Sequence, residues 1–285
     1  MSFIYMFFHA FLENFIYKRI NTKDNKNFQS SIMFLISSVT LFLIYLTFFG
    51  FKNEDFLFLK DYKFYILCFL EIGVFYLYRE NYNQNKNNYT MVNMFVFSTI
   101  YLMPIMAYFY NQIFSFDSSL DIKYESFIEA FIFSFTLFIL TSIYYISKIK
   151  NKEVKNLKLL ILLLFVLLNT MYFAVKTVQT YNGFLIYSFI QVVITINFFI
   201  LSQKGKNKEQ KTITLKDIVF YFLWPIYFSL FFLAAALMSV EFVTISKRIS
   251  QIISAMILDK KVIKKDFILI GFIFIITICF YFYKS

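Results

Sequence analysis

The chain has 285 residues, of which 60% are hydrophobic and only 16% are charged, and its formal net charge is +11. Its apolar residues form blocks of about 20, the length that a bilayer-crossing helix requires, separated by short runs rich in lysine and asparagine. This pattern excludes a soluble globular domain and predicts an all-α, multi-pass protein of the lipid bilayer. The positive charge lies mainly between the apolar blocks, where it determines topology, so no nucleic-acid partner is expected.

Ten apolar blocks follow one another along the chain and predict ten transmembrane helices. Their approximate ranges are 3–19, 30–50, 62–78, 90–114, 126–147, 157–177, 183–202, 217–237, 238–258 and 266–283. The eighth and ninth blocks are nearly continuous, and we expect a bend near Met238 and Ser239. Within the eighth block, Trp224-Pro225 predicts a kink, because proline frees a carbonyl group that then needs a local partner.

The two halves of the chain resemble each other. The segment LKDYKFYIL at 59–67 matches LKDIVFYFL at 215–223 in six positions of nine, and the segment at 122–138 matches that at 263–279. A polar insert at 78–88 explains most of the difference between the two offsets. We therefore expect two five-helix repeats, residues 1–150 and 151–285. Because five is odd, the second repeat is inverted, an arrangement that places a substrate site near the midplane and favours a transporter.

Lys247 and Arg248 lie near the middle of the ninth block. A charged group at that depth costs at least about 2.5–3.5 kcal/mol, so it is normally kept where it faces a polar cavity or a partner. The pair predicts a cavity that binds an anion, with arginine supplying a planar fork and lysine a mobile charge. A short loop at this point, or an internal ion pair with Glu241, would also account for the two charges.

Further candidates come from polar groups in other apolar blocks. Lys176 and Lys18 are cations that can face the same cavity or extend to the membrane interface. Glu71 and Glu129 are acids that can couple transport to protons or neutralise a buried lysine. The remaining candidate substrate contacts are Tyr101, Tyr172 and Asn169.

Motifs of enzymes and metal proteins are absent from the sequence. It contains no H-E-x-x-H, no cysteine–histidine cluster, no phosphate-binding glycine loop and no G-x-S-x-G. No catalytic residue, metal or cofactor is predicted. His9, the single histidine, is expected to pack between helices.

The end of the chain resembles the C-terminal signature of the triose-phosphate and nucleotide-sugar translocators, members of the drug/metabolite transporter superfamily with a ten-helix, EamA-like fold. In that signature a Lys-Arg pair, a glycine early in the last helix and a Tyr-Ser-like ending occur in order. Here these are Lys247-Arg248, Gly271 and Tyr283-Lys284-Ser285. NFIYKRIN at 14–21 is similar to the end of the family's first helix, and Pro104 matches a recurrent proline.

The chain departs from that family at two positions of the fourth block. Ile100 and Met103 stand where phosphate-translocating members carry a lysine and, often, a glutamate. The phosphate cage that the resemblance implies is therefore incomplete. The resemblance also implies cytoplasmic termini, whereas most lysine and arginine residues follow the odd-numbered blocks, which favours the opposite orientation.

These observations lead to an expected function. The chain is expected to exchange small organic anions, such as sugar phosphates or nucleotide sugars, by alternating access, as a monomer or homodimer. One alternative is a proton-coupled, EamA-type exporter of amino acids or other small solutes, with Glu71 as the coupling acid. A second is a membrane scaffold that transports nothing. The sequence does not assign a particular membrane.

Overall fold

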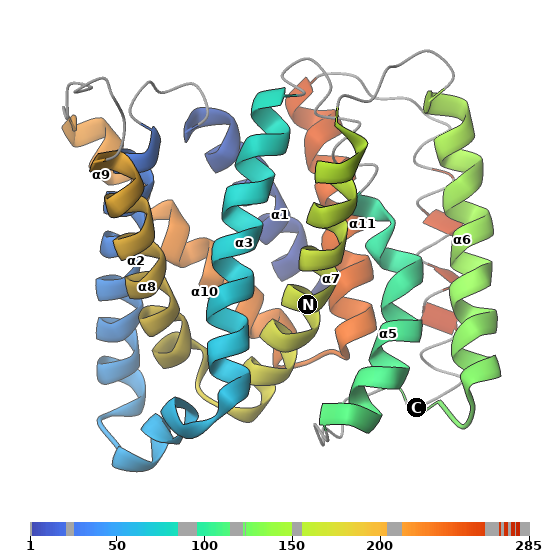
Figure 1. The fold of residues 1–285 in the computed structure, drawn as a ribbon, viewed down its shortest axis with the longest axis horizontal. Helices are drawn as coiled ribbons and strands as arrows, with labels where there is room; N and C mark the ends of the chain where they lie inside the picture. The colour runs from blue at the N-terminus through green and yellow to red at the C-terminus, as the bar shows by residue number, and fades with distance from the viewer. Residues whose placement is uncertain are drawn as a thin grey trace.

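The computed structural model describes residues 2–20, 26–84, 96–114, 122, 124–149, 156–203 and 213–259, with isolated residues between 268 and 279 (Figure 1). Throughout these residues the regular structure is helical, which confirms the all-α prediction. The helices are α1 (Ser2–Ile20), α2 (Lys26–Phe49), the short 3-10 helix η1 (Asn53–Lys60), α3 (Tyr62–Gln84), α5 (Thr99–Phe114), α6 (Phe127–Ile149), α7 (Leu157–Thr180), α8 (Gly183–Gln203), α9 (Leu215–Tyr221), α10 (Leu223–Ala235) and α11 (Val240–Asp259).

Four helical segments in the described part of the chain are long and apolar enough to cross a membrane. They are Asn27–Phe49, Leu157–Thr180, Gly183–Gln203 and Leu215–Ala235, the last formed by α9 and α10 together. Large apolar side chains also cover outward faces. On α2, for example, Leu35, Val39 and Leu43 follow one another at four-residue spacing and are 44%, 52% and 55% exposed. Such a face is stable against lipid, so the protein is membrane-embedded.

The helices α3 and α11 are less apolar because they carry charged residues, and the structure turns these charges inward. Glu71 and Arg79 on α3 and Glu241, Lys247 and Arg248 on α11 are each at most 9% exposed. Buried polar partners therefore replace water around groups that lipid does not solvate.

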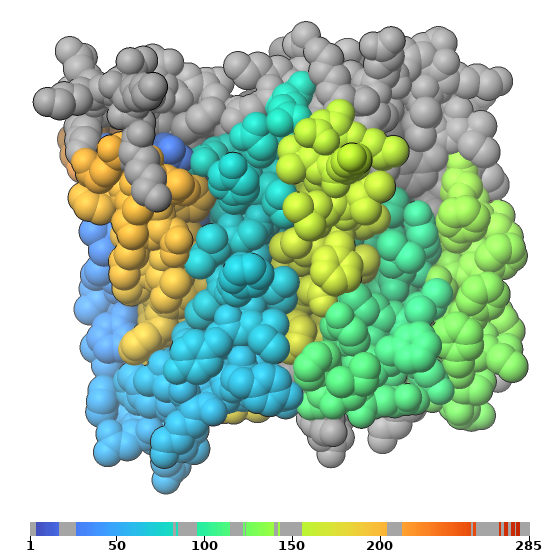
Figure 2. Space-filling model, in the orientation of Figure 1, coloured from blue at the N-terminus to red at the C-terminus, as the bar shows by residue number. Residues whose placement is uncertain are grey.

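The packing of the helices brings distant parts of the sequence together. Helix α1 packs against α10 and α11, α2 lies along α8, α3 lies along α7, and α5 contacts α6, α7 and α11. On one face α8, α3, α7, α5 and α6 lie side by side (Figure 2). Helices α2 and α7 begin on the upper side of the bundle in Figure 1. Helices α3, α6 and α8 end on that same side. Helices that follow one another along the chain, such as α2 and α3 or α7 and α8, therefore run in opposite directions, as in a chain that crosses a layer repeatedly.

Two expected interruptions are present. Helix α9 ends at Tyr221 and α10 begins at Leu223, so the break at Phe222 lies just before Trp224-Pro225. Between Ala235 and Val240 the chain leaves helical geometry, which confirms the bend near Met238 and Ser239.

The end of α3 differs from the sequence-based range. Helix α3 continues to Gln84, so part of the polar insert expected from residue 78 is helical. This occurs because Tyr78 and Asn81 are buried on its inner face, and Asn81 donates to the carbonyl groups of Leu77 and Leu159. The tenth expected span, with Tyr283, Lys284 and Ser285, lies almost entirely outside the described residues.

Candidate functional site

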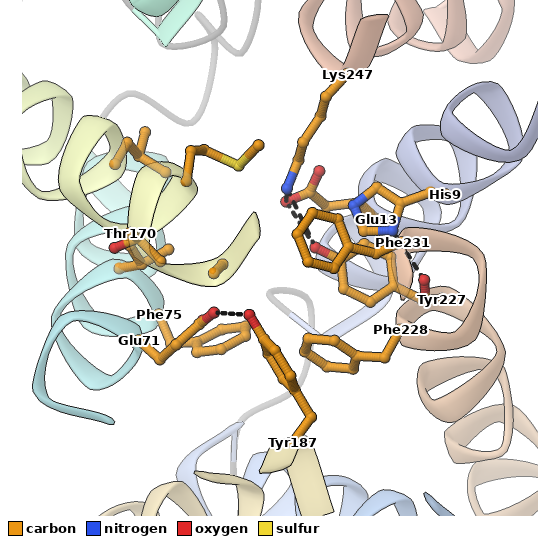
Figure 3. A pocket seen from close by; sticks show the side chains of 14 residues that line it. His9, Glu13, Glu71, Phe75, Thr170, Tyr187, Tyr227, Phe228, Phe231 and Lys247 are labelled. Carbon is orange, nitrogen blue, oxygen red and sulfur yellow. Dashed lines mark hydrogen bonds and ion pairs between the residues drawn. The ribbon is translucent and has the colours of Figure 1, made fainter. Parts of the chain in front are cut away.

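A cavity lies inside the bundle. Its walls come from α1, α3, α7, α8, α10 and α11, and thus from both halves of the chain. The polar side chains that line it are His9, Glu13, Glu71, Thr170, Tyr187, Tyr227 and Lys247 (Figure 3). The aromatic part of the wall is completed by Phe75, Phe228 and Phe231.

Helical spacing explains why these residues share the cavity. His9 and Glu13 are four positions apart on α1, so they lie on the same helix face. On α7 the lining positions 167, 170, 171 and 174 form one stripe with the same periodicity. Each helix thus presents a single face to the cavity and its other faces to neighbouring helices or lipid.

On one side of the cavity, Lys247 and Glu13 form an ion pair. The Lys247 ammonium nitrogen lies 3.6 Å from Glu13 Oε1, and both side chains are less than 10% exposed. The Tyr227 hydroxyl donates to the same oxygen at 3.3 Å, and Gln251 Nε2 donates to Glu13 Oε2 at 2.5 Å. The Glu13 carboxylate is therefore held by three groups from α10 and α11, which fixes α1 in place.

On the opposite side, Glu71 and Tyr187 face this group across the cavity (Figure 3). The Tyr187 hydroxyl donates to Glu71 Oε1 at 2.9 Å, and Glu71 is 6% exposed. No cationic side chain is hydrogen-bonded to Glu71 among the described residues. The cavity thus has one carboxylate neutralised by lysine and a second one held by a tyrosine alone.

His9 lies between the cavity and α10. Its Nδ1 is 2.8 Å from the backbone oxygen of Tyr227, and its ring stacks on that of Tyr227 with centroids 3.8 Å apart. The expected packing role of His9 is thus seen, but the residue also lines the cavity.

Arg248 has a different environment from its neighbour Lys247. Its Nε donates to Thr99 Oγ1 at 2.9 Å and its Nη1 to Gln251 Oε1 at 2.6 Å. It also reaches the hydroxyl of Tyr78 at 3.4 Å. Arg248 is 1% exposed and is not among the cavity-lining residues, so the two adjacent cations do not share this cavity.

Several expected substrate contacts lie between α5 and α7. Asn169 accepts a hydrogen bond from Tyr110 at 2.6 Å, and the Tyr172 hydroxyl donates to Asn111 at 2.6 Å. The Lys176 ammonium group lies 5.8 Å from the centre of the Tyr172 ring. Asn169 and Tyr172 thus join α7 to α5, and neither they nor Lys176 are among the described residues that line the cavity.

The other expected site residues are scattered. Tyr101 packs edge-on against Phe138 of α6, with ring centroids 5.1 Å apart. Glu129 accepts the backbone N–H of Glu125 at 2.8 Å, as an acid does at a helix start. The side chain of Lys18 lies outside the described residues.

Glu241 lies in the first turn of α11 and is 2% exposed. Burial, followed by the neighbouring Glu241 carboxylate, raises the pKa of Tyr124 well above its usual value, because both disfavour the phenolate. Tyr124 lies in the segment just before α6, so Glu241 contributes to the contact between this segment and α11. Of the two cations that the sequence offered as ion-pair partners of Glu241, Lys247 pairs with Glu13, and Arg248 donates to Thr99 and Gln251.

Glu13 is the main cavity residue that the sequence-based selection missed. It is a single acid in an apolar block, which is the signal that selected Glu71, and the same rule applied to residues 3–19 finds it. Tyr187 and Tyr227 carry no comparable signal, because the chain has 22 tyrosines. Among the described residues, no group of three or more His, Cys, Asp or Glu side chains is placed to hold a metal ion.

Comparisons with protein-family models, with curated proteins and with solved structures give no match for this chain. The similarity to sugar-phosphate translocators therefore stays a prediction. The geometry of the cavity is what bears on function.

Proposed function

We propose that the chain is a ten-span membrane transporter, built from two inverted halves, that moves a small solute by alternating access through the central cavity and couples this movement to protons. The observation that carries this proposal is the charge of the lining: its described residues include two carboxylates, Glu13 and Glu71, and one ammonium group, Lys247.

The packing of the helices supports the two-halves part of the proposal. Matched in chain order, α1 corresponds to α7, α2 to α8, α3 to the α9–α10 pair, and α5 to α11. Under this matching, the contact between α1 and α10 corresponds to the contact between α7 and α3. Likewise, the contact between α1 and α11 corresponds to the contact between α7 and α5. The contact between α2 and α8 is its own counterpart, because these two helices correspond to each other. Two halves related by a two-fold axis produce such reciprocal pairs.

The partners of the charged groups support coupling to protons. Because Lys247 is paired with Glu13, it does not leave a free positive charge that requires an anion. Glu71 lacks a cationic hydrogen-bonding partner among the described residues, so a proton or a positively charged group can balance it. Buried acids in membrane proteins commonly serve as proton carriers for this reason.

Transport assays with reconstituted protein test the proposal. Proteoliposomes with an imposed pH gradient are incubated with a defined mixture of amino acids, primary amines, sugar phosphates and nucleotide sugars, and their contents are analysed by mass spectrometry. The wild-type protein is expected to accumulate at least one solute only when the gradient is present. Glu71→Gln should abolish accumulation, whereas the exposed Glu54→Gln serves as a control that retains it.

Exchange of organic anions is the second candidate, and one observation favours it. Arg248 Nη2 is buried and has no hydrogen-bond partner within the described part of the chain, so it can receive an anionic oxygen. This candidate requires uptake that depends on a preloaded anion and not on the pH gradient. Arg248→Ala should then abolish exchange, and Arg248→Lys should restore it only partly, because the planar fork is absent. Absence of any flux would instead favour the scaffold alternative.

A further inference from the structure

The hydrogen bonds of His9 leave one ring nitrogen as an acceptor. A backbone carbonyl oxygen only accepts, so Nδ1 must carry the hydrogen in its 2.8 Å contact with Tyr227. In the neutral ring, Nε2 is then an acceptor. This atom is buried and has no partner among the described residues, and the ring lines the cavity. The site therefore contains an acceptor that needs a donor from the occupant.

Glu71 adds further acceptor capacity. A carboxylate offers about four lone-pair positions. Within the described residues, Glu71 receives a hydrogen bond from Tyr187 alone. By contrast, Glu13 is held by Lys247, Tyr227 and Gln251 and has little capacity left.

The lining also has a net negative charge. Among the described lining residues, Glu13 and Glu71 are opposed by Lys247 alone, since Arg248 does not reach the cavity surface. The rings of Phe75, Phe228 and Phe231 complete the walls, and aromatic faces attract cations as well as apolar groups. A positively charged group with several N–H donors and an apolar body matches both properties.

We propose that the cavity binds a small primary ammonium compound with an aromatic or apolar body. Its N–H groups bond to the Glu71 carboxylate and to His9 Nε2, and its body packs against the phenylalanine rings. This inference rests on the proposed transport function and names the substrate class of the same site. It demands hydrogen-bond donors, and so distinguishes a primary ammonium group from a quaternary one of equal charge.

Binding measurements on the purified full-length protein test this inference. The probes are 2-phenylethylammonium, its quaternary trimethylammonium analogue, phenylacetate and inorganic phosphate, each measured by thermal shift and by calorimetry. The primary ammonium compound should bind about tenfold more tightly than the quaternary one, because the latter leaves the acceptors unpaired. Phenylacetate and phosphate should not bind. Equal affinity for the two ammonium compounds, or binding of phosphate alone, would overturn the inference.

Two variants test the two proposed contacts of the ammonium group, one with Glu71 and one with His9. Glu71→Gln removes the charge and His9→Phe removes the acceptor while keeping a ring, and each should weaken binding of the primary ammonium compound about tenfold or more. The matched control, Glu54→Gln, should bind as the wild type does. If a variant does not fold, the probe series on the wild-type protein still decides the question.

The two proposals fail in different ways. Binding of the primary ammonium compound without any flux in proteoliposomes would support this inference and remove the transport function. The opposite result is accumulation of a solute without an amino group that depends on the pH gradient and on Glu71, with no binding of the amine. It would support the transport function and overturn this inference.

Discussion

The ammonium nitrogen of Lys247 lies 3.6 Å from a carboxylate oxygen of Glu13, although the two residues stand near opposite ends of the chain. The pair joins α11 to α1 across the wall of the cavity. Each group lies in an apolar block, so each supplies the counter-charge that makes burial of the other tolerable.

Removal of one partner of this pair should destabilise the fold. Glu13→Gln leaves Lys247 buried without a counter-charge, and loss of one partner of a buried pair typically lowers the free energy of unfolding by about 3–5 kcal/mol. Thermal unfolding in detergent measures the effect. The double variant Glu13→Gln/Lys247→Met should recover much of the loss, because it leaves no unpaired charge. Additive losses from the two single substitutions would show that the pair has no energetic coupling.

Tyr172→Phe should affect stability and leave transport intact. The substitution removes the 2.6 Å hydrogen bond to Asn111 at the α5–α7 interface, outside the cavity. The expected cost is about 1 kcal/mol in the free energy of unfolding. Transport kinetics of the folded variant should match those of the wild type. A large rise in KM with unchanged stability would assign Tyr172 to substrate binding, as the sequence predicts.

Gly183→Ala should destabilise the start of α8. A Cβ atom at this position would lie 3.0 Å from the Phe232 ring and 3.2 Å from a Val178 methyl group. Overpacking of this kind costs about 1–3 kcal/mol, measurable as a lower thermal midpoint. Gly73→Ala is the control, since its Cβ would meet one flexible methyl group of Val166 at 3.3 Å. An equal loss at both positions would argue against the close contact with Phe232.

Tyr181 should make stability sensitive to alkaline pH. This residue caps the end of α7, and burial followed by its hydrogen bond to Asp61 raises its pKa above the usual value of about 10. Because the pKa is higher in the folded state, the contribution to stability is full below about pH 10 and declines as pH rises further. The free energy of unfolding of Tyr181→Phe should decline less between about pH 10 and 11 than that of the wild type. Identical alkaline profiles for Tyr181→Phe and the wild type would contradict this.

Much of the helical layout follows from the sequence, because blocks of apolar residues and their breaks depend on local composition. The bend near Met238 and the break before Pro225 are of this kind. For α3 the sequence predicts too early an end, since the polar residues after Tyr78 are typical of a loop. Tyr78 and Asn81 are buried there by contacts with α7 and α11, which local composition does not reveal.

The site is harder to predict than the fold. The sequence correctly marks Lys247 and Glu71 as polar groups inside the bundle, but it does not say which partner each one meets. Lys247 and Arg248 are adjacent, and successive helical positions differ by about 100° in direction. One side chain therefore reaches Glu13 in the cavity, and the other reaches Thr99 of α5. Only the packing of the helices around α11 determines this division.

The ion pair between α1 and α11 also has a consequence for the order of synthesis. Helix α1 emerges from the ribosome with Glu13 in its apolar stretch, long before Lys247 has been made. A charge at the centre of a lone helix costs about 2.5–3.5 kcal/mol on insertion scales. The first helix therefore remains poorly anchored until α11 is inserted beside it. Chains that stop before α11 lack this counter-charge, so the segment that carries Lys247 decides how firmly α1 is held.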